Sequence, residues 1–139
     1  LREFLNNGFY NSAFTTAQQN AILLTDVDNS ASSTTSSTNP YACENTQDRV
    51  FALSYKEAFN SSYFASNTER QLKVTDYAKA AGAWFGTDDY ENVGWWWLRS
   101  PGYDYGYYAY GVYSDGYSND SYVDYSFYGV VPALQISLG

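Results

Sequence analysis

Residues 95 to 102, WWWLRSPG, place three consecutive tryptophans before a leucine, an arginine and a serine, and end in a Pro-Gly pair. Successive side chains of a strand point to opposite faces, so the three indoles cannot all lie on one side. We expect Trp96, or else its two neighbours, to be buried. Pro101 and Gly102 are turn-forming residues. The stretch therefore predicts a strand that ends at this turn and anchors a sheet.

The sequence after this stretch predicts more strands joined by turns. Residues 107–113, YYAYGVY, are followed by Asp115-Gly116, a dipeptide that is favoured in tight hairpins. Residues 129–138, GVVPALQISL, predict a closing strand because they are rich in β-branched and apolar residues. We expect an antiparallel sheet in this half of the chain.

Short helices and short strands are expected before the tryptophans. Leu1, Phe4 and Leu5 have the spacing of one face of an amphipathic helix, while residues 21–27 and 49–54 have strand character. Helices that precede an antiparallel sheet define the α+β class. Capping signals predict three further helices, at Thr16 with Gln19, at Ser54 with Glu57, and from Thr75 to a terminating Gly82.

Composition and charge limit the classes of partner that the protein can bind. The 139 residues suit one domain, residues 1–139, and the polar, low-complexity segment 28–45 predicts a mobile loop. The net charge is −8, and no Lys or Arg follows Arg99, which argues against binding to nucleic acid or to an anionic membrane. No apolar stretch reaches the length of a membrane helix. The single cysteine, Cys43, cannot form an internal disulfide.

Ten of the sixteen tyrosines lie between Tyr103 and Tyr128, mostly separated by Gly, Ser, Asp, Asn and Ala. They could alternate along strands as a sheet core, or belong to a disordered low-complexity segment, or form a binding surface. Tyrosine gives rigid, amphipathic contact area and small polar residues give adaptable hydrogen bonds, as in antibody paratopes. Adjacent tyrosines and few aliphatic neighbours favour the binding surface.

The residues give little support to catalysis or to a bound metal. The chain has no His, which excludes triads and metal sites that need His, and we expect no cofactor. Asp115, Asp120 and Asp124 could converge on calcium, but the motifs of calcium-dependent lectins are absent, so solvated turn aspartates are the preferred interpretation. Arg99 could meet a ligand anion; pairing with a carboxylate at residues 88–91 and stacking on a tryptophan is preferred.

Several blocks of the sequence resemble one bacterial and phage family. They are WWWLRSPG at residues 95–102, Val112 with Ser-Asp-Gly at 114–116, and GVVPAL at 129–134. Residues 1–14 and 46–58 also look like blocks of that family. It is similar to the variable proteins of diversity-generating retroelements. The resemblance implies a C-type-lectin-like fold of the subclass related to the formylglycine-generating enzyme, with a variable region at residues 103–128.

The resemblance also implies roles for individual residues. In such systems an error-prone reverse transcriptase changes adenines in a template copy, so that Asn-type codons come to encode Tyr, Asp, Ser, Gly, Ala or Phe. The implied ligand-binding residues are Tyr103, Asp104, Tyr105, Tyr107, Tyr108, Tyr110, Tyr113, Tyr117, Asn119, Asp120, Tyr122, Asp124, Tyr125, Phe127 and Tyr128. The implied fixed scaffold is Trp95, Trp96, Trp97, Arg99, Val112, Ser114, Asp115, Gly116, Val123 and Pro132.

Two features depart from the family pattern. Its closing arginine is Val131 here, so whatever contact that arginine makes must be absent or replaced. Strands usually precede the first helix of the family, and we expect that this chain lacks those N-terminal strands.

The function implied by the resemblance is non-enzymatic binding of a protein or glycan ligand by a receptor or adhesion domain. We expect it to be extracellular, on a bacterial surface or a phage virion, without nucleic acid or membrane insertion, and with oligomerisation left open. One alternative is a carbohydrate-binding lectin of fixed specificity. Another is a phage or surface structural protein that uses residues 103–128 as an oligomer interface.

Overall fold

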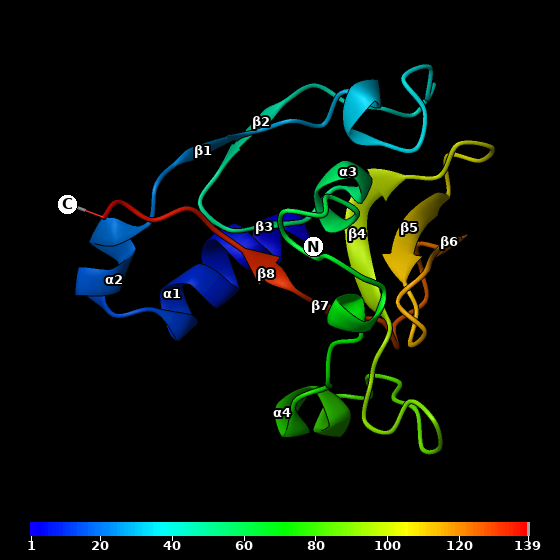
Figure 1. Cartoon of the computed structure of the whole chain (residues 1–139). Helices are drawn as coiled ribbons and strands as arrows, with labels where there is room; N and C mark the ends of the chain where they lie inside the picture. Colours follow the sequence, from blue (N-terminus) through cyan, green and yellow to red (C-terminus); the bar gives the residue numbers. More distant parts are fainter. Residues whose placement is uncertain (139) are drawn as a thin grey trace.

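The computed structural model describes residues 1–138, and its N-terminal part is helical (Figure 1). The π-helix η1 (Phe4–Phe9) continues into α1 (Tyr10–Ala13), and α2 (Thr16–Ala21) follows. Only Leu5 is buried in this segment, so the predicted apolar face is mostly wrong. The wider turn of a π-helix changes the angular spacing on which that pattern relies. The capping box of α2 lies one residue earlier than predicted, at Thr15 and Gln18.

The segment 28–45 joins β1 (Thr25–Val27) to β2 (Thr46–Asp48), which pair antiparallel as a separate ribbon. It contains the 3₁₀-helix η2 (Ala31–Ser33) and buries several small polar side chains. Asn39 is one of them, and its Nδ2 donates to the carbonyls of residues 101 and 102 at 3.2 and 3.3 Å. The segment is thereby tied to the end of the tryptophan strand, and its mobility stays a prediction.

Two of the capping predictions are confirmed in the middle of the chain. Ser54 and Glu57 form the capping box of α3 (Tyr55–Ala58), and Thr75 caps α4 (Asp76–Ala80), which Gly82 follows at a φ of +95°. The two remaining elements of this part are β3 (Phe51–Ala52) and the 3₁₀-helix η3 (Thr68–Arg70).

The largest sheet has four strands in the order β6-β5-β4-β7. Neighbouring strands are antiparallel except β7, which runs parallel to β4. The strands are β4 (Trp96–Pro101), β5 (Tyr108–Val112), β6 (Ser118–Tyr122) and β7 (Gly129–Val130). The predicted hairpin at Asp115-Gly116 therefore joins β5 to β6, and the fold is α+β, as expected from the sequence.

The closing strand predicted at residues 129–138 is wrong as a single element. β7 pairs with β4, whereas β8 (Pro132–Ala133) pairs with β3, and Ile136 makes an isolated bridge to Ile22. Pro132 has no N–H to donate, which disfavours an uninterrupted ladder at this point. The C-terminal segment consequently connects the large sheet to the N-terminal helices (Figure 1).

The core lies between α3 and one face of the large sheet. Its buried centre is Ala58 of α3 with Trp96, Leu98 and Val112 of β4 and β5. Trp96 is 2% exposed and donates its indole N–H to the carbonyl of Arg70 at 3.1 Å, which confirms the predicted orientation of the tryptophan block. Within residues 1–138, no helix has the length and apolar character needed to cross a membrane.

Candidate functional site

One end of the large sheet gathers most of the exposed tyrosines. β4 ends, β5 begins and β6 ends at the same side, because these neighbours are antiparallel. The loop at residues 101–108 and the start of the segment 122–127 therefore meet there, and the segment then returns along the sheet toward β7. We call the exposed side chains at this end the tyrosine surface, and they are Tyr41, Tyr103, Tyr105, Tyr107, Tyr122 and Tyr125.

The rings of this surface support one another. Tyr105 stacks on Tyr107 with centroids 5.3 Å apart, and Tyr107 lies nearly parallel to Tyr122 at 5.7 Å. Tyr122 then contacts Tyr125 at 5.6 Å, and Tyr125 stacks on Phe127 at 5.1 Å. Aromatic pairs at such distances are attractive beyond the area they bury. The tyrosine surface is therefore a connected row of rings that is open to solvent.

A buried layer lies behind this row. Tyr128 is only 6% exposed, stacks on Trp97 at 3.9 Å and shares a hydrogen bond of 2.7 Å with the hydroxyl of Ser121. Tyr113 contacts the same hydroxyl at 3.0 Å and stacks on Trp95 at 4.5 Å. The prediction that Tyr128 faces a ligand is wrong, because its ring fills the space over Gly111 on the sheet.

The other implied ligand-binding residues divide by position. Tyr110 and Tyr113 are half-buried, and the ring of Tyr110 packs against Tyr55 of α3 at 5.5 Å. Tyr117 and Asn119 are exposed but lie beside the Asp115-Gly116 turn, at the opposite end of the strands. The structure brings the remaining ten of the implied residues to or beside the tyrosine surface, with Tyr108, Asp120 and Phe127 half-buried and Asp104 and Asp124 exposed among them.

The environment of the tyrosines favours their neutral form. The hydrogen bond with Tyr122, together with burial, raises the pKa of Tyr108 to about 12. Partial desolvation and the neighbouring phenols raise the pKa of Tyr107, and burial raises that of Tyr128. These groups therefore act as uncharged donors and acceptors near neutral pH, and the charge at this end of the sheet comes from its carboxylates.

The residues of the implied scaffold differ in burial. Val112 is fully buried, whereas Val123, in the turn after β6, is 57% exposed and is not a core residue. Pro132 contributes backbone pairing in β8, but its side chain is exposed. Val131, at the position of the family arginine, packs against the core instead of making a polar contact.

Arg99 has a structural role, but with a partner other than the one predicted. Its guanidinium makes two contacts with Glu57, at 2.5 and 3.1 Å, and donates to the carbonyls of Ala52 and Asp28 at 2.8 and 3.0 Å. It lies over the ring of Phe51, not over a tryptophan, at 5.7 Å. The carboxylates at residues 88–91 are not its partners. The Arg99 side chain reaches the first turn of α3, where Glu57 lies.

Tyr41 belongs to the surface although it was absent from the implied set. Its ring lies against Gly106, where a Cβ would come within 2.9 Å of it. The Asn39 contacts with the end of β4 hold this part of the segment 28–45 in place. The one sequence feature that could have indicated this role is that Tyr41 is a lone aromatic residue within a stretch of Ser, Thr and Asn.

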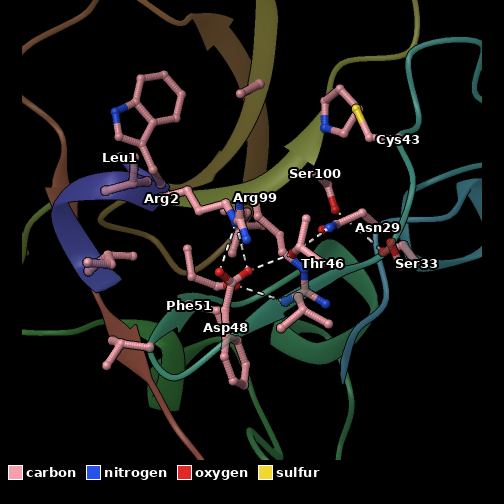
Figure 2. A pocket seen from close by; sticks show the side chains of 18 of the residues that line it. Leu1, Arg2, Asn29, Ser33, Cys43, Thr46, Asp48, Phe51, Arg99 and Ser100 are labelled. Carbon is pink, nitrogen blue, oxygen red and sulfur yellow. Dashed lines mark hydrogen bonds and ion pairs between the residues drawn. The ribbon is translucent and has the colours of Figure 1, made fainter. Parts of the chain in front are cut away.

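A cavity of about 570 Å³ lies beside the same end of the sheet. Figure 2 shows the polar part of its wall, where Asp48 accepts hydrogen bonds from Arg2 and Thr46 at 2.8 and 2.6 Å. Cys43 lines its rim and is exposed. Apolar side chains from the N-terminal segment, the β1–β2 ribbon and the sheet make up much of the remaining wall, among them Leu1, Leu5, Val27, Trp97 and Val123.

The aspartates do not form a recognisable metal site. In the part of the chain that the structure describes, no three of the His, Cys, Asp and Glu side chains are close enough together to hold an ion. Asp115 instead accepts from the backbone N–H of Tyr117 at 3.0 Å, as a turn aspartate does. The geometry therefore offers no convergence of Asp115, Asp120 and Asp124 on calcium.

Comparison with known proteins gives a family and no closer relative. A family model described as a domain of unknown function, DUF6273, matches residues 1–138. Neither the search of curated proteins nor the search of solved structures found a match.

Proposed function

The chain belongs to the DUF6273 family, described as a domain of unknown function, and from the geometry of its site we propose that it is a non-enzymatic ligand-binding domain. In this proposal the fold is C-type-lectin-like and the tyrosine surface contacts a protein or another surface ligand. The domain acts outside the cell, on a bacterial surface or a phage virion. Its binding residues are diversified in the manner of retroelement variable proteins.

The observation that carries the proposal is the connected row of exposed rings from Tyr105 to Phe127. Exposed aromatic patches are characteristic of interaction surfaces, and binding hot spots are rich in Tyr and Trp. Rings that already contact one another lose little conformational freedom when a ligand arrives. Such a row therefore suits affinity that comes from rigid contact area.

Diversification is supported by the separation of exposed and buried aromatic residues. The tyrosines of the surface contact mainly one another, while the tryptophan strand forms the core with α3 through Trp96 and Leu98. A surface whose side chains do not hold the core can change without unfolding the domain. This arrangement is what a variable binding region requires.

Sequencing the same locus in sibling isolates tests the proposal. We expect substitutions concentrated in residues 103–127, restricted to codons derived by changes at adenine, with Trp96, Val112 and Tyr128 unchanged. An invariant sequence at the tyrosine surface across isolates whose other genes differ would overturn the diversification. Loss of captured surface protein on changing Tyr107 and Tyr122 to Ser, with folding retained, would establish the binding role separately.

A further inference from the structure

We propose that the tyrosine surface binds a cationic partner, namely a protein segment rich in Arg or Lys. This inference rests on the proposed binding function and names the chemistry of the ligand. It is carried by the charges that accompany the exposed rings.

Every charged side chain in the two loops of the surface is acidic. Asp104 lies between two of its tyrosines, and Asp124 lies directly before Tyr125; both are exposed. Asp120 is half-buried, and its Oδ2 lies near Gly102, 3.3 Å from where a Cβ on that residue would be. All three carboxylates therefore belong to, or lie next to, the segments that carry the exposed rings.

No basic side chain offsets these carboxylates from within the surface. None of the seven Lys and Arg residues falls in the contributing segments, which are residues 39–43, 101–108 and 120–127. The nearest arginine in sequence, Arg99, has only 12% of its side chain exposed and is paired with Glu57. A partner carrying carboxylates or phosphates would meet repulsion without a compensating donor.

Cationic side chains fit both components of the surface. A guanidinium or ammonium group is attracted to the face of a tyrosine ring and to a carboxylate beside it. Arginine in particular stacks on aromatic rings while its N–H groups reach neighbouring acceptors. The net charge of −8 would add long-range steering toward such a partner.

Binding of fluorescein-labelled octa-arginine, followed by fluorescence anisotropy, tests the inference. The variant D104N/D120N/D124N removes three charges at the surface with little change of shape. The control variant D76N/D88N/D89N removes three charges from exposed aspartates of α4 and the segment before β4. Both variants have the same net charge, so any difference between their affinities for octa-arginine reports the location of the binding site.

We expect the surface variant to weaken binding about tenfold and to flatten its salt dependence, and the control to weaken it less than about threefold. Replacing Tyr107 and Tyr122 by Ser should weaken it further, because the ring faces are lost. Labelled octa-glutamate should not bind. Equal losses in the two aspartate variants, or no binding of octa-arginine to the unaltered domain, would overturn the cationic partner.

That failure is distinguishable from failure of the binding function itself. If residues 103–127 vary among isolates while octa-arginine binding does not depend on Asp104, Asp120 and Asp124, the surface binds a ligand of another class. If residues 103–127 are invariant and octa-arginine binding still depends on the three aspartates, the cationic partner is supported and the diversification is overturned.

Discussion

Trp96 begins β4, and Tyr107 immediately precedes the neighbouring strand β5, yet the two aromatic side chains have opposite surroundings. Trp96 is 2% exposed, packs against α3 and donates its indole N–H to a backbone carbonyl. Tyr107 is 52% exposed and contacts only other tyrosines among the aromatic rings. Aromatic residues therefore serve two purposes in this fold. Trp96 stabilises the core of the domain, and Tyr107 is available to contact a ligand.

Trp96→Ala is the strongest test of this difference. The substitution empties the centre of the core and leaves the Arg70 carbonyl without its donor, so we expect the free energy of unfolding to fall by about 4 kcal/mol. Urea denaturation followed by circular dichroism measures the loss. Trp84→Ala is the matched control at a tryptophan that is 36% exposed, and it should cost less than half as much. Equal losses would mean that Trp96 is not the centre of the core.

Gly116→Ala tests the turn that joins β5 to β6. Gly116 has a φ of +80°, and a Cβ there would lie 2.0 Å from the carbonyl oxygen of Asn67. We expect a destabilisation of about 3 kcal/mol, from the strained backbone and from the steric overlap together. Gly82→Ala is the control, since its φ is +95° but no atom lies within 4 Å of its Cβ position. A loss no larger than that of the control would exclude the overlap.

Features encoded by neighbouring residues could be predicted from the sequence. The Ser54–Glu57 capping box spans four residues, the Asp115-Gly116 turn is a dipeptide signal, and the burial of Trp96 follows from alternation along one strand. Each of these depends on short-range geometry. The α+β class follows because the order of such local signals is itself readable from the sequence.

Features that depend on distant residues could not be predicted. The partner of Arg99 is Glu57, which is 42 residues away, and no local pattern selects it over nearer carboxylates. Tyr125 and Tyr128 have the same side chain three residues apart, yet one is exposed and the other is buried over Gly111. Tyr41 packs on Gly106 from a loop that Asn39 ties to the end of β4, more than 60 residues away in sequence. Tertiary packing decides all three outcomes.

Alkaline pH tests the hydrogen bond between Tyr108 and Tyr122 of the tyrosine surface. The pKa of Tyr108 is raised to about 12, above the value near 10 that tyrosine has in an unfolded chain. Its contribution to stability is therefore complete below about pH 10 and is lost as the pH rises toward 12. Urea denaturation at pH 9, 10 and 11 should show falling stability. Tyr108→Phe should reduce this fall, whereas Tyr63→Phe, at an exposed position outside the sheet, should leave it unchanged.

Tyr107→Ser should have the smallest effect on stability, in contrast to Trp96→Ala in the core. Tyr107 is 52% exposed, and loss of its ring removes contacts with Tyr105, Tyr108 and Tyr122 but no contact with the core, so we expect a change of about 1 kcal/mol or less. Tyr128→Ser, the buried control, removes the stack on Trp97 and should cost about 3 kcal/mol. Urea denaturation of both variants measures the ratio. A loss at Tyr107 as large as that at Tyr128 would mean that the exposed row also holds the sheet together, and a surface of that kind could not vary freely.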